Sequence, residues 1–182
     1  MRKLLFLLVC AALMLGMSAQ AVAIYGSLPD DGIYVEQSQK HTCTLVAATM
    51  MLRNYAFQYG RDYDEITVGA MQRICWGGYG LAQKFSVGSI EVTHNTDISG
   101  VKDKKAYLVE QLKNHPEGIV VYNANQPHAV FVFGYREDMD TFFCADTTGQ
   151  KSMRMITLGE TLLTGDGQQG KIDRLTKIWH IK

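Results

Sequence analysis

The spacing of hydrophobic positions changes along this chain, from a helical period in its first half to a strand period in its second half. Between Cys43 and Gly60, apolar residues recur at intervals of three or four, which is the period of one helix face. The positions of this face are Leu45, Ala48, Leu52, Tyr55 and Tyr59. Much of the opposite face is apolar too, so the pattern predicts a central helix that is buried on most sides and ends near Gly60.

Two further helices are predicted from caps and apolar spacing. One begins with Asp64 as its N-cap and ends near Gly77, where glycines interrupt the pattern. The other covers 102–114, with Leu108 and Leu112 facing inward.

Strand-like runs dominate the second half of the chain. Three of them follow closely, at 119–122, 128–135 and 141–145. The short turns between them imply antiparallel neighbours, and 178–181 is expected to add an edge strand. We interpret 24–40 as an extended lead-in and 79–100 as a mixed lobe of the same domain. Helices followed by a compact antiparallel sheet predict an α+β fold.

The first 23 residues are predicted to be a secretory signal peptide. Two basic residues precede an apolar run over 4–15, and small residues follow up to Ala23. The run is too short to span a bilayer, and cleavage fits after Ala21 or Ala23. Residues 24–182 suffice for one domain with a substantial core. We therefore expect a secreted or periplasmic monomer without an integral membrane segment after cleavage.

Charge and motif spacing exclude several classes of partner. Removing Arg2 and Lys3 with the signal changes the formal net charge from 0 to −2. A near-neutral chain without basic runs argues against nucleic acid or anionic membranes as partners. No CxxC or HxxxH spacing occurs, so neither a metal site nor a cofactor is expected. The remaining histidines are expected on the surface or in loops: His41, His94, His115 and His180. Trp76 and Tyr79 are expected to pack, with a groove lining as the alternative.

An odd number of cysteines remains after signal cleavage. Cys10 leaves with the signal, where the bulky Val9 before it argues against a lipid anchor, and Cys43, Cys75 and Cys144 stay. Outside the cell at least one of the three cannot pair within a monomer. A bond between Cys75 and Cys144 is the economical expectation, and two buried thiols are the alternative.

Cys43 is the candidate nucleophile. The positive end of a helix favours a thiolate there, whereas the alternative is an inert core cysteine. His128 begins one strand and Asp146 ends the next, so a short hairpin brings them together. Asp146 then orients the imidazole, and the imidazole serves as the base for the thiol.

A candidate oxyanion donor precedes the helix. Gln37 lies six residues before Cys43 on an extended segment. Its amide and the backbone N–H of Cys43 can donate two hydrogen bonds to a tetrahedral oxyanion. Gln39 competes for this role.

Four segments in this order resemble the bacteriocin-processing peptidases and their free-standing relatives, the C39-like group. The segments are Gln37 to Cys43, the buried helix, Pro127-His128-Ala129-Val130-Phe131-Val132-Phe133-Gly134-Tyr135, and Phe142-Phe143-Cys144-Ala145-Asp146. The resemblance covers roughly 35–149. It implies a papain-like cysteine peptidase with Cys43 as nucleophile, His128 as base, Asp146 as orienting group and Gln37 as oxyanion donor. The expected substrate is a peptide or protein outside the cell.

Two departures from the family pattern leave other functions open. Thr44 stands where the family usually has glycine after the cysteine, and Thr147 replaces its frequent proline after the aspartate. One alternative is another papain-like amide hydrolase or acyltransferase acting on cell-wall peptides. A second is a binding or immunity-type protein on the same fold without turnover. Labelling of Cys43 by a thiol reagent separates the enzymes from the binding protein.

Overall fold

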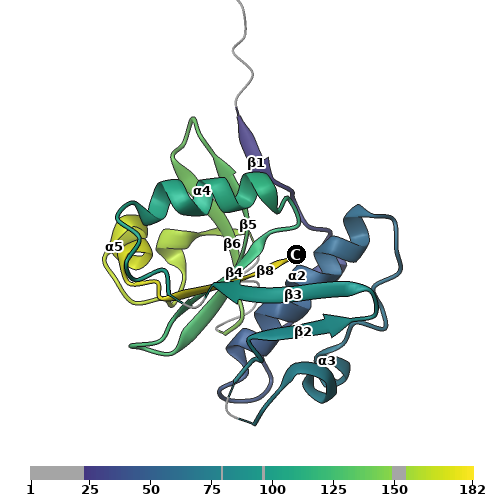
Figure 1. Cartoon of the computed structure of the whole chain (residues 1–182). Helices are drawn as coiled ribbons and strands as arrows, with labels where there is room; N and C mark the ends of the chain where they lie inside the picture. The colour runs from purple at the N-terminus through teal and green to yellow at the C-terminus, as the bar shows by residue number, and fades with distance from the viewer. Residues whose placement is uncertain (1–22, 79, 96, 149–154) are drawn as a thin grey trace, which may run out of the picture.

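The computed structural model of the chain describes residues 23–78, 80–95, 97–148 and 155–182 (Figure 1). The predicted signal peptide, with Cys10, lies outside these residues, as does Tyr79. The described part has an α+β architecture, as the sequence predicts: four α-helices pack against one antiparallel sheet of eight strands.

The sheet has the strand order β2-β3-β8-β4-β5-β6-β7, and β1 pairs with the second half of β5. Its strands are β1 (Ile24–Gly26), β2 (Lys84–Val87), β3 (Ile90–Asn95), β4 (Ile119–Asn123), β5 (His128–Arg136), β6 (Thr141–Asp146), β7 (Ile156–Thr157) and β8 (Lys177–Ile181). The runs predicted as β4, β5 and β6 are confirmed to within one residue at each end.

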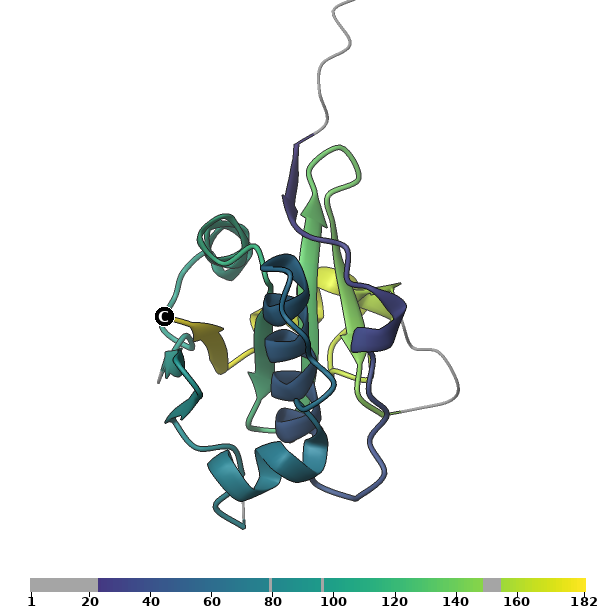
Figure 2. The ribbon, with the colours of Figure 1, turned by 90° about the vertical axis from the view of Figure 1, so that its right-hand side faces the viewer.

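The helices cover both faces of this sheet (Figures 1 and 2). They are α2 (Cys43–Gln58), α3 (Val68–Cys75), α4 (Lys104–Asn114) and α5 (Gly167–Asp173), with short 3-10 turns η1 (Asp31–Ile33) and η2 (Leu158–Glu160). Helices α2 and α3 share a core with one face, and α4 and α5 share a core with the other. The predicted central helix is confirmed: every residue of α2 from Cys43 to Leu52 is buried.

Strand β5 lies between the two cores. Successive side chains of a strand point to opposite faces of the sheet. Accordingly Phe131 and Phe133 face α2, whereas Val130 and Val132 face α4 and α5, and all four are fully buried. A continuous apolar run therefore suits this position, because both of its faces are covered by helices.

The N-terminus of α3 differs from the prediction. Thr67, and not Asp64, is the N-cap, with its side chain accepting a hydrogen bond from the N–H of Ala70 at 3.1 Å. The backbone N–H of Asp64 instead donates to the Asp62 carboxylate at 2.9 Å, within a preceding turn. The helix begins at the threonine because its backbone is extended, as an N-cap requires.

The expected edge strand is an internal one. Trp179 of β8 lies opposite His94 of β3 on one side and Val120 of β4 on the other. The hairpin β2–β3, which turns at Gly88 with a positive φ of 58°, was not predicted in full and takes the outer position. Strands β2 and β3 of the expected lobe thus extend the same sheet.

Candidate active site

Helix α2 begins at Cys43 after an unusual backbone turn. His41 has a positive φ of 66°. The hydroxyl of Thr42, the N-cap residue, donates to the carbonyl of Gln39 at 2.8 Å and does not cap the helix. The positive end of α2 is therefore presented to the Cys43 side chain without a neutralising cap. Cys43 itself is 8% exposed and lines a cleft.

His128 and Asp146 meet where β5 begins and β6 ends, as the hairpin predicts. Asp146 lies opposite Val130, so His128 is its diagonal neighbour on the same face of the sheet. Nε2 of His128 and Oδ1 of Asp146 are 2.7 Å apart. Their side chains are 13% and 0% exposed, so this contact is largely shielded from water.

The carboxylate of Asp146 is fixed by two backbone donors besides the histidine. The N–H of Thr148 donates to Oδ1 at 3.2 Å, and the N–H of Leu162 donates to Oδ2 at 2.7 Å. Both oxygens are therefore engaged, and the plane of the carboxylate cannot rotate without breaking a hydrogen bond.

The loop that carries Leu162 is itself held by a buried lysine. Nζ of Lys171 donates to the carbonyls of Thr161 and Leu163 at 2.6 and 2.5 Å, on either side of Leu162. Sequence reasoning missed both residues. Leu162 contributes only a backbone N–H, which no side-chain motif reveals, and Lys171 looks like any surface lysine until the fold buries it.

The ring of His128 is coupled to both Asp146 and Cys43. Burial alone would lower the pKa of His128, but hydrogen bonding to Asp146 and to Cys43, together with their negative charges, raises it to about 9. Since Nε2 faces Asp146, Nδ1 is the nitrogen left for the sulfur. An imidazolium at neutral pH is the charge partner that a thiolate requires.

The two glutamine candidates occupy different positions. The backbone N–H of Gln37 donates to the carbonyl of Thr147 at 2.9 Å, which ties this segment to the residue after Asp146. Its Nε2 donates to the carbonyl of Gln39 at 2.6 Å, the same carbonyl that Thr42 contacts. A side-chain amide has two N–H donors, so one remains for a ligand. The side chain of Gln39 is exposed to solvent.

The cleft at Cys43 has a volume of about 660 Å³, which is within the range of small-ligand sites. Its described lining is His41, Cys43, Thr44, Trp76, Gly78, Gly80, Leu81, Gln83, His94, Tyr122, Pro127, Lys177 and Trp179. Burial and the charge of Cys43 both raise the pKa of Tyr122. Trp76 packs against the core beside α2, as expected, and also lines this groove, which was the alternative. His94, expected on the surface, is buried in this wall, so that prediction was wrong.

The other two thiols lie on opposite sides of the sheet. Cys75 belongs to the core beside α2, where its sulfur donates to the carbonyl of Met71 at 3.0 Å, and Cys144 belongs to the core beside α4. Burial raises the pKa of Cys75 to about 12 and that of Cys144 well above its usual value. The expected disulfide was wrong because the sheet separates the pair, and the alternative of two buried thiols holds.

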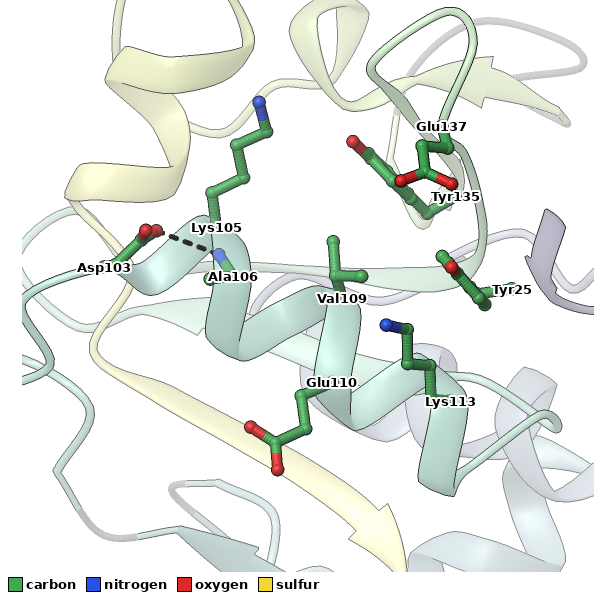
Figure 3. Close-up of a pocket in the computed structure, with 9 residues that line it drawn as sticks. All are labelled: Tyr25, Asp103, Lys105, Ala106, Val109, Glu110, Lys113, Tyr135 and Glu137. Atoms are coloured by element: carbon green, nitrogen blue, oxygen red, sulfur yellow. Dashed lines mark hydrogen bonds between the residues drawn. The ribbon is translucent and has the colours of Figure 1, made fainter. Parts of the chain in front are cut away.

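A second hollow, between α4, β1 and β5, has a volume of about 510 Å³ (Figure 3). Several of its charged side chains have partners: Asp103 caps α4 through the N–H of Ala106, and Lys105 pairs with Asp140 at 2.5 Å. Lys113 lies over the ring of Tyr25, 4.5 Å from its centroid. Its described lining contains no cysteine or histidine, so the Cys43 cleft is the better candidate for chemistry.

Comparison of the chain with family models, with curated proteins and with solved structures finds no match. Within the described residues, no group of three or more metal-ligating side chains is found. None of the described helices is long and apolar enough to cross a membrane.

Proposed function

We propose that this protein is a cysteine peptidase of the C39-like group with a papain-like fold, exported by its signal peptide. The observation that carries the proposal is the contact of 2.7 Å between His128 and Asp146, beside a cysteine at the start of a buried helix. A nucleophile, a base and a group that orients the base are the three parts that thiol hydrolysis needs.

The reaction follows from these positions. The Cys43 thiolate attacks the carbonyl carbon of the scissile bond and forms a C–S bond. The N–H of Cys43 and the amide of Gln37 donate hydrogen bonds to the oxyanion. The His128 imidazolium then gives its proton to the leaving nitrogen, and the C–N bond breaks.

The resulting thioester is hydrolysed by a water molecule. Neutral His128 takes a proton from this water while its oxygen attacks the thioester carbon. The C–S bond then breaks, which releases the acid and restores the thiolate–imidazolium pair. Asp146 accepts a hydrogen bond from His128 in both steps and stabilises its charged form.

Three substitutions test the proposal. Cys43→Ala should abolish peptide hydrolysis, because no thioester can form. His128→Ala should come close to the same loss, and Asp146→Asn should cost less, because an amide still orients the ring. Initial rates of hydrolysis of the peptides in a casein digest rank the three variants, and circular dichroism confirms that each variant is folded.

Matched controls define what would contradict the assignment. Cys75→Ala removes a buried thiol from the same core and should leave the rate per folded molecule unchanged. Full activity of Cys43→Ala would refute the proposal. Release of fragments from muropeptides, and not from peptides, would move the substrate class to cell-wall peptides while leaving the same residues in their roles.

A further inference from the structure

His94 is a buried polar side chain without a partner. It is 9% exposed, and within the described residues neither of its ring nitrogens has a hydrogen-bond partner. Buried polar groups in folded proteins are nearly always hydrogen-bonded, so such an exception needs an explanation. Since His94 lines the Cys43 cleft, a ligand in that cleft is the partner within reach.

Lys177 lies in the same cleft, and no described carboxylate pairs with it. Among the described residues it forms no ion pair, and no described lining residue carries a carboxylate. Surface lysines need no partner, but a half-buried lysine in a cleft whose described lining holds no carboxylate creates a positive potential in a confined space.

The sheet register brings these groups together on one face. Lys177 and Trp179 are two residues apart on β8, so their side chains point the same way. Tyr122 lies opposite Lys177, and His94 lies opposite Trp179. The rings of His94 and Trp179 meet edge to face, with centroids 5.3 Å apart. The pairing of β8 with β3 and with β4 therefore fixes the positions of these side chains in the wall of the cleft.

Resting on the proposed function, we propose that Lys177 and His94 bind a carboxylate of the substrate beside the scissile bond. A carboxylate accepts hydrogen bonds without donating any, and its negative charge can pair with the ammonium of Lys177. The aromatic walls of Trp179 and Tyr122 cover the rest of the ligand. The peptidase thus selects anionic peptides.

The state of His94 fits this role. Burial lowers its pKa, and the positive charge of Lys177 lowers it further. The ring is therefore neutral at neutral pH and offers one N–H to an acceptor, while Lys177 supplies the charge. Two sources provide a carboxylate: the side chain of aspartate or glutamate, or the free C-terminus of a peptide.

A binding measurement tests the inference without turnover. The chain has two tryptophans, Trp76 and Trp179, and both line the cleft, so intrinsic fluorescence reports its occupancy. The Cys43→Ala protein is titrated with Ala-Ala-Glu-Ala-Ala capped at both ends and with its glutamine counterpart. The glutamine peptide is also supplied with a free C-terminus, which separates the two sources of carboxylate.

We expect at least one carboxylate peptide to bind about 10-fold to 100-fold more tightly than the capped glutamine peptide. Lys177→Met should remove this preference. Lys177→Glu should reverse it, so that this variant prefers a capped peptide with lysine in place of the glutamate. Such a reversal cannot come from misfolding. Lys182→Met is the matched control, because Lys182 follows the same strand but pairs with Glu91 at 3.3 Å outside the cleft. Equal binding of the capped glutamate peptide, the capped glutamine peptide and the glutamine peptide with a free C-terminus to the Cys43→Ala protein would overturn the inference.

Cleavage of a random nine-residue peptide library distinguishes this inference from the proposed function. Cys43-dependent cleavage without enrichment of a carboxylate near the cut contradicts only the specificity. A carboxylate preference in binding, combined with no Cys43-dependent cleavage of peptides, contradicts only the peptidase proposal. His94→Phe, which retains a ring against Trp179, should weaken the preference with little change in thermal stability.

Discussion

At the scale of single residues, the protonation of His128 decides how the site behaves. Its pKa is about 9 in the folded protein, against 6.5 for an unperturbed histidine. The cause lies in the two groups on either side of the ring, Asp146 and Cys43. Both favour the imidazolium strongly enough to overcome burial, so the charged ring predominates at neutral pH.

The first prediction concerns stability against pH. A folded pKa above the unfolded value means that the charged ring stabilises the folded state fully below about pH 6.5, and that this contribution is lost as the pH rises through about 9. The midpoint temperature of thermal unfolding should therefore decrease as the pH rises from about 6.5 to about 9. His128→Gln should lack this fall, and a wild-type midpoint that stays flat from pH 6.5 to 9.5 would contradict the assignment.

A second prediction separates the two glutamines. Gln37→Ala should lower turnover by about 10²-fold to 10³-fold, because it removes one oxyanion donor. Cys43 should stay reactive towards iodoacetamide, because the nucleophile is untouched. Gln39→Ala leaves the contacted backbone carbonyl in place and should change turnover little. If Gln37→Ala left turnover unchanged and Gln39→Ala lowered it, the oxyanion donor would be Gln39 and not Gln37.

At the scale of elements, the site depends on how its strands and loops hold one another. The hairpin β5–β6 positions His128 beside Asp146, and the loop through Leu162 fixes the carboxylate from the other side. Lys171 of α5 fastens this loop through two carbonyls. Helix α5 thus supports the candidate site without contributing a side chain to it.

The third prediction uses two buried lysines as a matched pair. Lys171→Met and Lys104→Met each leave two backbone carbonyls without a donor, since Lys104 bonds those of Asp173 and Leu175. Each should destabilise the fold by about 1–3 kcal/mol. Only Lys171→Met should also move the alkaline limb of kcat/KM to lower pH, because Asp146 would hold the imidazolium less firmly.

Chemical denaturation and pH–rate profiles of both variants provide the comparison. An equal shift of the alkaline limb in Lys104→Met would show that general loosening is responsible, and not the loop at Leu162.

Sequence reasoning reached the elements that carry periodic patterns or caps. The helix at Cys43 and the strands at His128 and Asp146 follow from apolar spacing and short turns. The position of β8 within the sheet does not follow from these patterns, because the sequence of a five-residue strand does not indicate which strands pair with it. His94 was misplaced for the same reason: its burial depends on pairing with Trp179, which lies far away in sequence.

At the scale of the whole molecule, two cores on opposite faces of one sheet set the chemistry of the thiols. Cys75 lies in one core and Cys144 in the other, so they cannot pair without unfolding. Sequence spacing alone could not separate these faces, because the assignment depends on the complete strand order. Of the three described cysteines, Cys43 lines the cleft, whereas Cys75 and Cys144 are buried in the two cores.

The fourth prediction follows from this separation. Under native conditions iodoacetamide should modify Cys43, and it should reach Cys75 and Cys144 only after unfolding, because burial raises the pKa of both. Peptide mapping by mass spectrometry locates the label, with Cys43→Ala as the control that takes up none. Native labelling of Cys75 or Cys144 would contradict the two-core arrangement.

The internal position of β8 has a consequence for the order in which the cleft is assembled. This strand follows all the others along the chain, yet it joins β3 to β4 and carries Lys177 and Trp179 into the wall of the cleft. Until β8 is inserted, the hairpin β2–β3 has no partner in the rest of the sheet. A chain that has formed α2 but has not yet inserted β8 therefore has Cys43 at its helix start but no finished cleft. Under the proposed function, this topology delays activity until β8, the last strand along the chain, has joined the sheet.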